Sequence, residues 1–240
     1  MERLQFELPR SALNPMRGLL IAIALVIFVG GCSDAQTQQT SAKSEVVPLG
    51  TGFDFYVLSL SWSPGYCASE GGDADANQCG GSRRYAFVVH GLWPQYARGY
   101  PSDCNSSFGE KVDNKLATSM TDIMPSFGLI RHQWKKHGRC SGLSQQDYFD
   151  VTRAAFGKIT TPPSFAGLRE TKTIAPQAVE KLFQAENKSV PADAIAVTCK
   201  GNYMRDVRIC MSKDLANFVS CAEVDRNSCK SNTMAVAPIR

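Results

Sequence analysis

Apolar residues follow two kinds of spacing along this chain, and together they predict a mixture of strands and helices. Residues 53–62, 85–89, 195–198 and 205–211 form short runs rich in β-branched and aromatic side chains, which is typical of strands. Residues 113–127, 145–159 and 176–187 have the spacing of amphipathic helices. Residues 67–81 are rich in Gly, Asp and Asn and are expected to form a loop.

The order of these elements predicts a single α+β domain over residues 52–240. Strands and helices do not alternate strictly, which favours a mostly antiparallel central sheet flanked by helices. A chain of 240 residues is long enough for one domain with a sizeable core, and we find no internal repeat in it.

The N-terminal region has the pattern of an export signal. Arg17 is followed by an uncharged apolar run, residues 19–29, which is too short to span a bilayer comfortably. The run ends in VGGC, residues 29–32, which resembles the lipobox of bacterial lipoprotein signals. We expect a signal peptide over residues 1–31 and a lipid on Cys32. An ordinary signal peptide and an uncleaved anchor are the alternatives.

The segment after Cys32 predicts a tether and a location. Residues 32–51 are rich in Gln, Thr, Ser and Ala, which is typical of a flexible linker. Ser33, in place of aspartate, favours the outer membrane over the inner one. We expect an exported monomer at the periplasmic face of the envelope, held there only by its lipid, or a secreted protein.

Composition adds one firm expectation and leaves one question open. The chain has nine cysteines, and leaving out Cys32 gives an even number, which in an exported chain predicts four disulfides. Spacing alone does not fix their pairing. The formal net charge of +4 permits a polyanionic partner without requiring one.

The three histidines of the chain fall in two short segments. The first segment, residues 87–94, reads FVVHGLWP and places His90 at the end of an apolar strand. Gly91 would let the backbone approach a ligand closely, and Trp93 offers a flat face on which a base can stack. Taken alone, this segment is equally compatible with a strand end whose tryptophan fills the core.

The second segment, residues 132–140, reads HQWKKHGRC. On a helix with about 100° per residue, the side chains of His132, Gln133, Lys136 and His137 share one side, while Lys135 points away. Zinc-binding histidines on a helix are normally four residues apart, whereas a gap of five separates them by about 140°. We therefore expect no metal here, and no thiol nucleophile, because the cysteines are predicted to be paired.

Two histidines and a lysine suit the cleavage of RNA. RNA carries its own nucleophile, the 2′-hydroxyl, so one neutral imidazole can accept its proton while an imidazolium protonates the departing 5′-oxygen. A lysine would stabilise the charge that develops on the phosphorane. The sequence thus predicts a metal-independent endoribonuclease without a cofactor. A metal-dependent phosphoesterase would need a carboxylate–histidine cluster that we do not find.

The two segments resemble the signature motifs of the ribonuclease T2 family, F-x-x-H-G-L-W-P and H-E-W-x-K-H-G-x-C. The resemblance implies an α+β fold and cleavage of single-stranded RNA through 2′,3′-cyclic phosphates to 3′-phosphates. It implies that His137 is the general base, His90 the general acid, His132 a phosphate ligand and Lys136 a stabiliser of the transition state. Trp93 and Tyr100 would line a base site. The cysteine layout of the family implies the pairs Cys67–Cys79, Cys104–Cys140, Cys199–Cys229 and Cys210–Cys221.

One position departs from the family pattern. Gln133 stands where the family usually has glutamate, and an amide can bind a phosphate oxygen but cannot hold a charge or carry a proton. We therefore expect an active but slower enzyme. The alternative is a catalytically impaired lipoprotein that binds RNA or nucleotides on the same scaffold, but the intact histidines and Lys136 favour catalysis.

Overall fold

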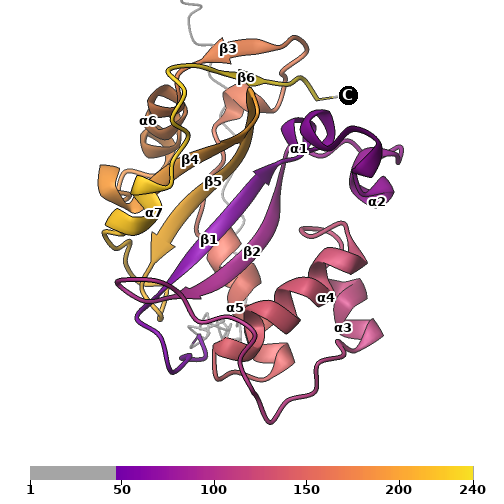
Figure 1. The fold of residues 1–240 in the computed structure, drawn as a ribbon, viewed down its shortest axis with the longest axis vertical. Helices are drawn as coiled ribbons and strands as arrows, with labels where there is room; N and C mark the ends of the chain where they lie inside the picture. The colour runs from indigo at the N-terminus through magenta and orange to yellow at the C-terminus, as the bar shows by residue number, and fades with distance from the viewer. Residues whose placement is uncertain (1–46, 240) are drawn as a thin grey trace, which may run out of the picture. The chain divides into compact units, whose positions relative to one another are not determined.

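A six-stranded, mostly antiparallel sheet organises the described part of the chain, residues 47–239, in this computed structural model (Figure 1). The strand order is β2-β1-β5-β6-β3, with β4 also paired to β5, and β5–β6 is the one parallel pair among these strands. The predicted α+β fold is confirmed. The strands are β1 (Phe55–Trp62), β2 (Phe87–Gln95), β3 (Lys172–Ile174), β4 (Ile195–Lys200), β5 (Tyr203–Met211) and β6 (Met234–Val236).

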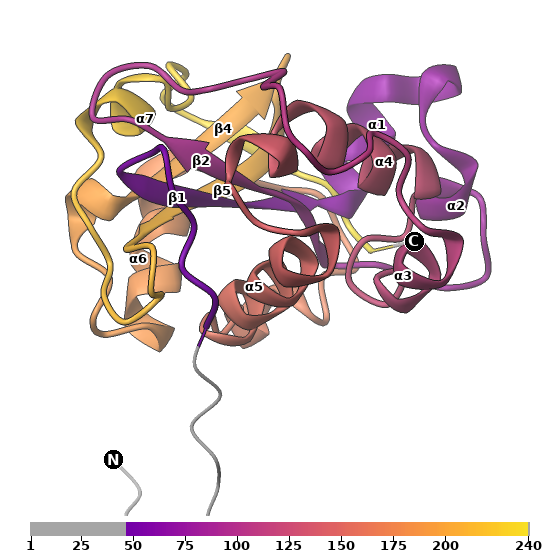
Figure 2. The same cartoon turned by 90° about the horizontal axis from the view of Figure 1, so that it is seen from below.

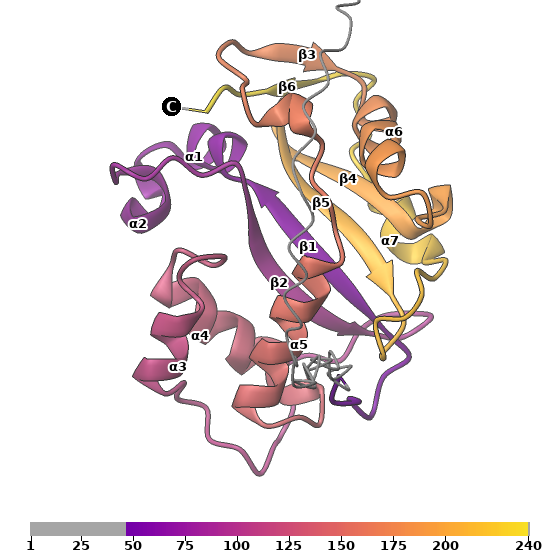
Figure 3. The same ribbon diagram turned by 180° about the vertical axis from the view of Figure 1, so that it is seen from behind.

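Helices cover the sheet unequally. Helices α5 and α6 lie on one face and α7 lies on the other (Figure 2), and α5 packs against β1 and β2 (Figure 3). The main core is the layer beneath α5 and α6, where each large apolar side chain contributes about 1.5–3 kcal/mol. The helices are α1 (Ser63–Glu70), α2 (Ala76–Cys79), α3 (Asn114–Ser119), α4 (Phe127–Lys136), α5 (Gln145–Gly157), α6 (Pro176–Glu186) and α7 (Ala222–Arg226).

The single helix predicted over residues 113–127 is wrong, because the segment contains α3 and the start of α4. The side chain of Asp113 caps α3, and the hydroxyl of Ser126 accepts a hydrogen bond from Leu129 N at 3.1 Å to begin α4. Pro125 separates the two helices because it cannot donate to a continuing helix. Apolar spacing that runs through both helices concealed this boundary.

The loop predicted over residues 67–81 is also wrong in part. Helix α1 continues to Glu70, and α2 begins after Asp75, whose carboxylate accepts a hydrogen bond from Asn77 N at 2.8 Å. Both helices are short, and a disulfide between Cys67 and Cys79 joins them. The sequence missed these helices because Gly and Asp residues dominate the composition of the segment.

Four disulfides lie in the described residues, and they join the pairs implied by the family resemblance. The Cys104–Cys140 bridge has the most direct bearing on the histidine segments. It connects the loop that follows β2 to the short 3₁₀ turn that follows α4.

The predicted signal peptide, Cys32 and residues 33–46 of the predicted tether lie outside the described residues. The described end of that tether, residues 47–51, lies against the domain. Val47 packs against the main core, and Thr51 N donates a hydrogen bond to Ser141 O at 2.9 Å. None of the helices within residues 47–239 has the length and apolar character needed to cross a bilayer.

Candidate active site

His90 lies in the middle of β2, at a β-bulge, and not at the end of a strand as predicted. In the pairing with β1, Gly91 lies opposite Ser59 and Val89 lies opposite Leu60, so His90 has no partner. A bulge redirects the side chains on either side of it. The rings of His90 and Trp93 consequently meet with their centroids 5.4 Å apart, in an edge-to-face arrangement.

The carboxylate of Asp206 on β5 holds the His90 ring. Asp206 Oδ1 lies 3.3 Å from His90 Nδ1, and Asp206 is only 3% exposed. The pairing of β4 with β5 is irregular at this same point, between Val197 and Cys199. Thr198 Oγ1, inside that irregularity, lies 3.4 Å from Asp206 Oδ2. Both register shifts of the sheet thus occur where these two side chains meet.

Asp206 is an ionised carboxylate in this setting. Burial acts to raise its pKa, but the hydrogen bond from His90 and the positive charges of His90, Arg208 and Arg205 outweigh it, so the pKa lies below its usual value. Because Asp206 engages Nδ1 of His90, Nε2 is the ring nitrogen left for other partners.

The second histidine segment leaves the helix before His137. Helix α4 ends at Lys136, His137 has φ −121° and ψ −46°, and residues 138–140 form a 3₁₀ turn, so the continuous helix assumed for residues 132–140 is wrong. A Cβ on Gly138 would lie 2.5 Å from the Trp134 ring and 2.9 Å from the Tyr148 ring. Only glycine therefore fits where the chain turns.

Tyr148 connects the two histidine segments. Its ring lies beside Gly138, and its hydroxyl donates a hydrogen bond to Leu92 O on β2 at 2.8 Å. The backbone also contributes, because Asp103 N, next to the bridged Cys104, donates to Lys136 O at 2.9 Å. The end of α4 is thus fixed against β2 and against the loop that follows β2.

His137 is held as a neutral imidazole. It is 8% exposed, and its Nδ1 atom is buried without a hydrogen-bond partner. Burial, followed by the positive charges of Lys136, His132 and His90, lowers its pKa to about 4, against a weak opposing effect of Asp103. His90 and His137 therefore have opposite surroundings: the first contacts a carboxylate, and the second is buried among cations.

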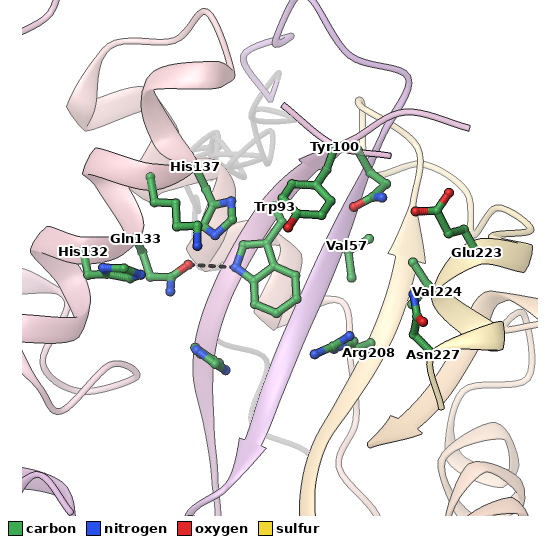
Figure 4. Close-up of a pocket in the computed structure, with 13 residues that line it drawn as sticks. Val57, Trp93, Tyr100, His132, Gln133, His137, Arg208, Glu223, Val224 and Asn227 are labelled. Carbon is green, nitrogen blue, oxygen red and sulfur yellow. Dashed lines mark hydrogen bonds between the residues drawn. The ribbon is translucent and has the colours of Figure 1, made fainter. Parts of the chain in front are cut away.

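Trp93, in the first histidine segment, also contacts two residues of the second segment. Its Nε1 donates a hydrogen bond to Gln133 Oε1 at 2.7 Å, shown as the dashed line in Figure 4. Its ring centroid is 5.5 Å from that of His137, and the guanidinium carbon of Arg208 lies 5.1 Å from the ring. Both imidazoles thus pack against the same indole.

We expect Gly91→Ala to disrupt this arrangement, because the new Cβ would lie 2.1 Å from Gln133 Oε1 and 2.5 Å from Trp93 Nε1. Such overpacking should lower the free energy of unfolding by about 1–3 kcal/mol, which denaturant titration measures. Gly157→Ala, at the end of α5, is the matched control, because its new Cβ would meet nothing within 4 Å. Equal stability of the two variants would show that Gly91 has no packing role.

One cavity of about 310 Å³, large enough for a small ligand, collects the candidate residues. Side chains of α4 lie on one side of Trp93, and those of β5 and α7 lie on the other (Figure 4). Lys135 is absent from the lining and pairs instead with Glu110 at 3.3 Å, outside the cavity. The seven candidates that line the cavity are His90, Trp93, Tyr100, His132, Gln133, Lys136 and His137.

A sequence model of the Ribonuclease T2 family matches residues 53–221. The chain belongs to the ribonuclease T2 family. It is 35% identical over 179 residues to a ribonuclease of Aeromonas hydrophila, and the match covers 71% of this chain and 77% of that protein. A probable ribonuclease of Haemophilus influenzae is 36% identical over 121 residues, which are 45% of this chain and 44% of that one.

Solved structures agree with this family fold. RNase NT in complex with 5′-AMP superposes with a TM-score of 0.62 at 22% identity, covering 79% of this chain and 100% of that one. An RNase-related protein from Calystegia sepium gives a TM-score of 0.61, also at 22% identity, over 79% and 98% of the two chains. The family match over residues 53–221 confirms the resemblance identified from the two histidine motifs.

Sequence reasoning missed several residues of this ribonuclease T2 site. Arg208, Glu223 and Asn227 line the cavity, and Asp206, which is not in its lining, contacts His90. The signal that could have found two of them is the run Arg205-Asp206-Val207-Arg208, because charged side chains are rare in a strand expected to be buried. Glu223 and Asn227 lie on and just after α7, which is too short for its spacing to be recognised.

No cluster of three or more His, Cys, Asp or Glu side chains within residues 47–239 has the arrangement of a metal site. The polar groups of the cavity are mainly nitrogen donors, with Lys136, Arg208 and three histidines among them. Donors of this kind suit an anionic ligand.

Proposed function

We propose that this protein is an endoribonuclease that cleaves single-stranded RNA by transphosphorylation, without a metal or other cofactor. The observation that carries the proposal is the placement of two imidazoles from separate segments, His90 and His137, against one indole in one cavity. Their opposite surroundings suit opposite roles in proton transfer. Family membership and the ribonuclease names of the relatives support the same substrate.

The first step moves two protons and exchanges one bond at phosphorus. Neutral His137 accepts the proton of the 2′-hydroxyl as the 2′-oxygen attacks the phosphorus, and the bond to the 5′-oxygen breaks. Protonated His90, beside Asp206, gives its proton to the departing 5′-oxygen. Each transfer accelerates the reaction by about 10²- to 10⁴-fold, and the attack is intramolecular. The product is a 2′,3′-cyclic phosphate, which water opens to a 3′-phosphate with the two roles reversed.

The charged side chains of α4 complete the site. Lys136 and His132 line the cavity, and neither has a carboxylate within ion-pair distance in the part of the chain that the structure describes. The charge of Lys136 and the ring nitrogens of His132 are available for the non-bridging phosphate oxygens, where negative charge grows in the transition state. Trp93 and Tyr100 supply aromatic surface for a base on the same side.

A second cavity favours endonucleolytic over exonucleolytic cleavage. It measures about 290 Å³ and shares His90 and His132 with the first cavity, while its other walls include Ser61, Tyr66 and Ser126. A phosphate at the shared histidines would have room for a nucleoside on each side. An RNA strand could therefore lie across the site with neither end inside it.

The decisive test is to incubate the domain with RNA and with DNA of the same sequence, both in excess EDTA. We expect RNA to be cut internally to products that end in 2′,3′-cyclic phosphate, and DNA to stay intact because it lacks the nucleophile. Loss of RNA cleavage in EDTA would contradict metal independence. Cleavage of the DNA would contradict the mechanism, and binding of RNA without cleavage would favour the impaired binding protein.

We expect Gln133→Glu to raise the rate of RNA cleavage by up to about tenfold. A carboxylate oxygen can keep the hydrogen bond from Trp93 Nε1, and its charge beside His137 should raise the pKa of that imidazole above about 4 and make it a stronger base. The measurement is kcat/KM as a function of pH, whose ascending limb should move to higher pH. Gln133→Ala, which loses the hydrogen bond, is the control. A slower Gln133→Glu enzyme would show that glutamine is no handicap here.

We also propose that the protein is exported and anchored as a monomer by a lipid on Cys32. The support is the sequence pattern of residues 16–32. Labelling cells with a radioactive fatty acid tests it, since the wild-type protein should take up label and Cys32→Ser should not. Release of unlabelled wild-type protein into the medium would favour an ordinary signal peptide.

A further inference from the structure

His90 contacts one carboxylate and is surrounded by several basic groups. The cavities on either side of it are lined by basic groups from β5 and from the α4 segment. In the described residues, Asp206 is the acidic side chain in hydrogen-bond contact with His90. The other charged or titratable groups that line the two cavities with His90 fall into three kinds. They are the basic groups Arg205, Arg208, His132, Lys136 and His137, the carboxylates Asp75 and Glu223, and the phenols Tyr66 and Tyr100.

The two neighbouring arginines, Arg205 and Arg208, are engaged with groups other than Asp206. Arg205 is engaged by the carboxylate of Glu70 and lies 3.2 Å from Ser69 Oγ. Arg208 packs over the Trp93 ring, and its Nε atom is buried without a hydrogen-bond partner. The side-chain hydrogen-bond partners of Asp206 among residues 47–239 are His90 and Thr198. Its negative charge therefore acts mainly on one imidazole.

We propose that Asp206 is a positioning residue for the proton donor His90. Its carboxylate accepts the hydrogen on Nδ1, which orients the ring with Nε2 toward the scissile phosphate and stabilises the imidazolium before proton transfer. During the step the proton passes from Nε2 to the 5′-oxygen, and Asp206 remains ionised. The inference rests on the proposed function, since it assigns a partner to the general acid of that reaction.

The first test is the pH profile of Asp206→Asn, which keeps the shape of the side chain and removes its charge. We expect kcat for RNA to fall by about 10- to 100-fold with little change in KM. The descending limb of the profile should move to lower pH, because His90 would lose the carboxylate that contacts its ring. Glu70→Gln is the matched control. It removes a carboxylate from the adjacent ion pair with Arg205 and should leave the profile unchanged.

A change of leaving group separates positioning from general structural support. A nucleoside 3′-(4-nitrophenyl phosphate) releases a nitrophenolate, which departs without being protonated. Asp206→Asn and His90→Ala should therefore recover to within a few-fold of the wild-type rate on this substrate, whereas His137→Ala should stay impaired. An Asp206→Asn defect of equal size on both substrates would overturn the proposal, because it would indicate damage to the whole site.

A third measurement needs neither substrate nor variant. Nitrogen NMR of the wild-type protein at alkaline pH should show hydrogen on Nδ1 of His90 and none on Nε2, and the opposite tautomer would overturn the proposal. These experiments distinguish failure of the proposed function from failure of the role assigned to Asp206. A wild-type protein that does not cut RNA rejects the proposed function, whereas a normal wild-type enzyme with an unchanged Asp206→Asn profile rejects only the role of Asp206.

Discussion

Alanine at His137 or at His90 should reduce kcat/KM for RNA by about 10²- to 10⁴-fold. In the proposed mechanism, His137→Ala removes the buried, neutral imidazole that accepts the 2′-hydroxyl proton, and His90→Ala removes the imidazolium that protonates the 5′-oxygen. Steady-state cleavage of a fluorogenic RNA measures both effects. The two defects should not add in the double variant, because each transfer depends on the other within one step.

Two controls separate chemistry from folding in this experiment. Lys135→Ala changes a neighbouring cation on α4 that pairs with Glu110 outside the cavity, so its activity should match the wild type. Thermal unfolding shows whether each variant retains the disulfide-bonded fold. Strand scission at the wild-type rate by a folded His137→Ala protein would reject the assignment of the base, and the same result for His90→Ala would reject that of the acid.

The motifs located the candidate site because most of its side chains are concentrated in two short segments. The seven residues singled out from those segments and the loop between them all line one cavity. The regular elements were also predictable: β1, α5 and α6 begin and end within a few residues of their expected bounds. In α5 and α6 the periodicity of the apolar positions matches a buried face, whereas β1 is buried along its whole length.

What escaped prediction depends on contacts between distant segments. The bulge at His90 arises from the register between β1 and β2, which no local pattern in β2 records. Asp206 lies 116 residues from its partner in the sequence, and nothing in its neighbourhood indicates which histidine it will meet. The turn at His137 is fixed by Tyr148 packing beside Gly138, a contact made only when α5 docks. Motifs thus identify reactive groups, while tertiary structure sets their orientation and protonation.

Acid should destabilise the wild-type protein more than the His137→Ala variant. The pKa of His137 is about 4 in the folded protein, against an ordinary value of 6.5. Between these values the unfolded chain binds a proton that the folded protein excludes, so stability falls as the pH decreases from 6.5 to 4. The shift corresponds to about 3 kcal/mol. Denaturant unfolding of both proteins at neutral pH and at pH 4 measures this loss. Between the two pH values, the free energy of unfolding should fall further for the wild type than for His137→Ala.

The same proton should limit catalysis. A base must be neutral to accept the 2′-hydroxyl proton, so kcat/KM should rise with pH along a limb centred near pH 4, where free His137 loses its proton. Stability and activity would then titrate together, because burial among cations both costs folding energy in acid and keeps the base free of its proton. Parallel stability curves for wild type and His137→Ala, with an ascending limb near pH 6.5, would show that His137 is not buried in this way.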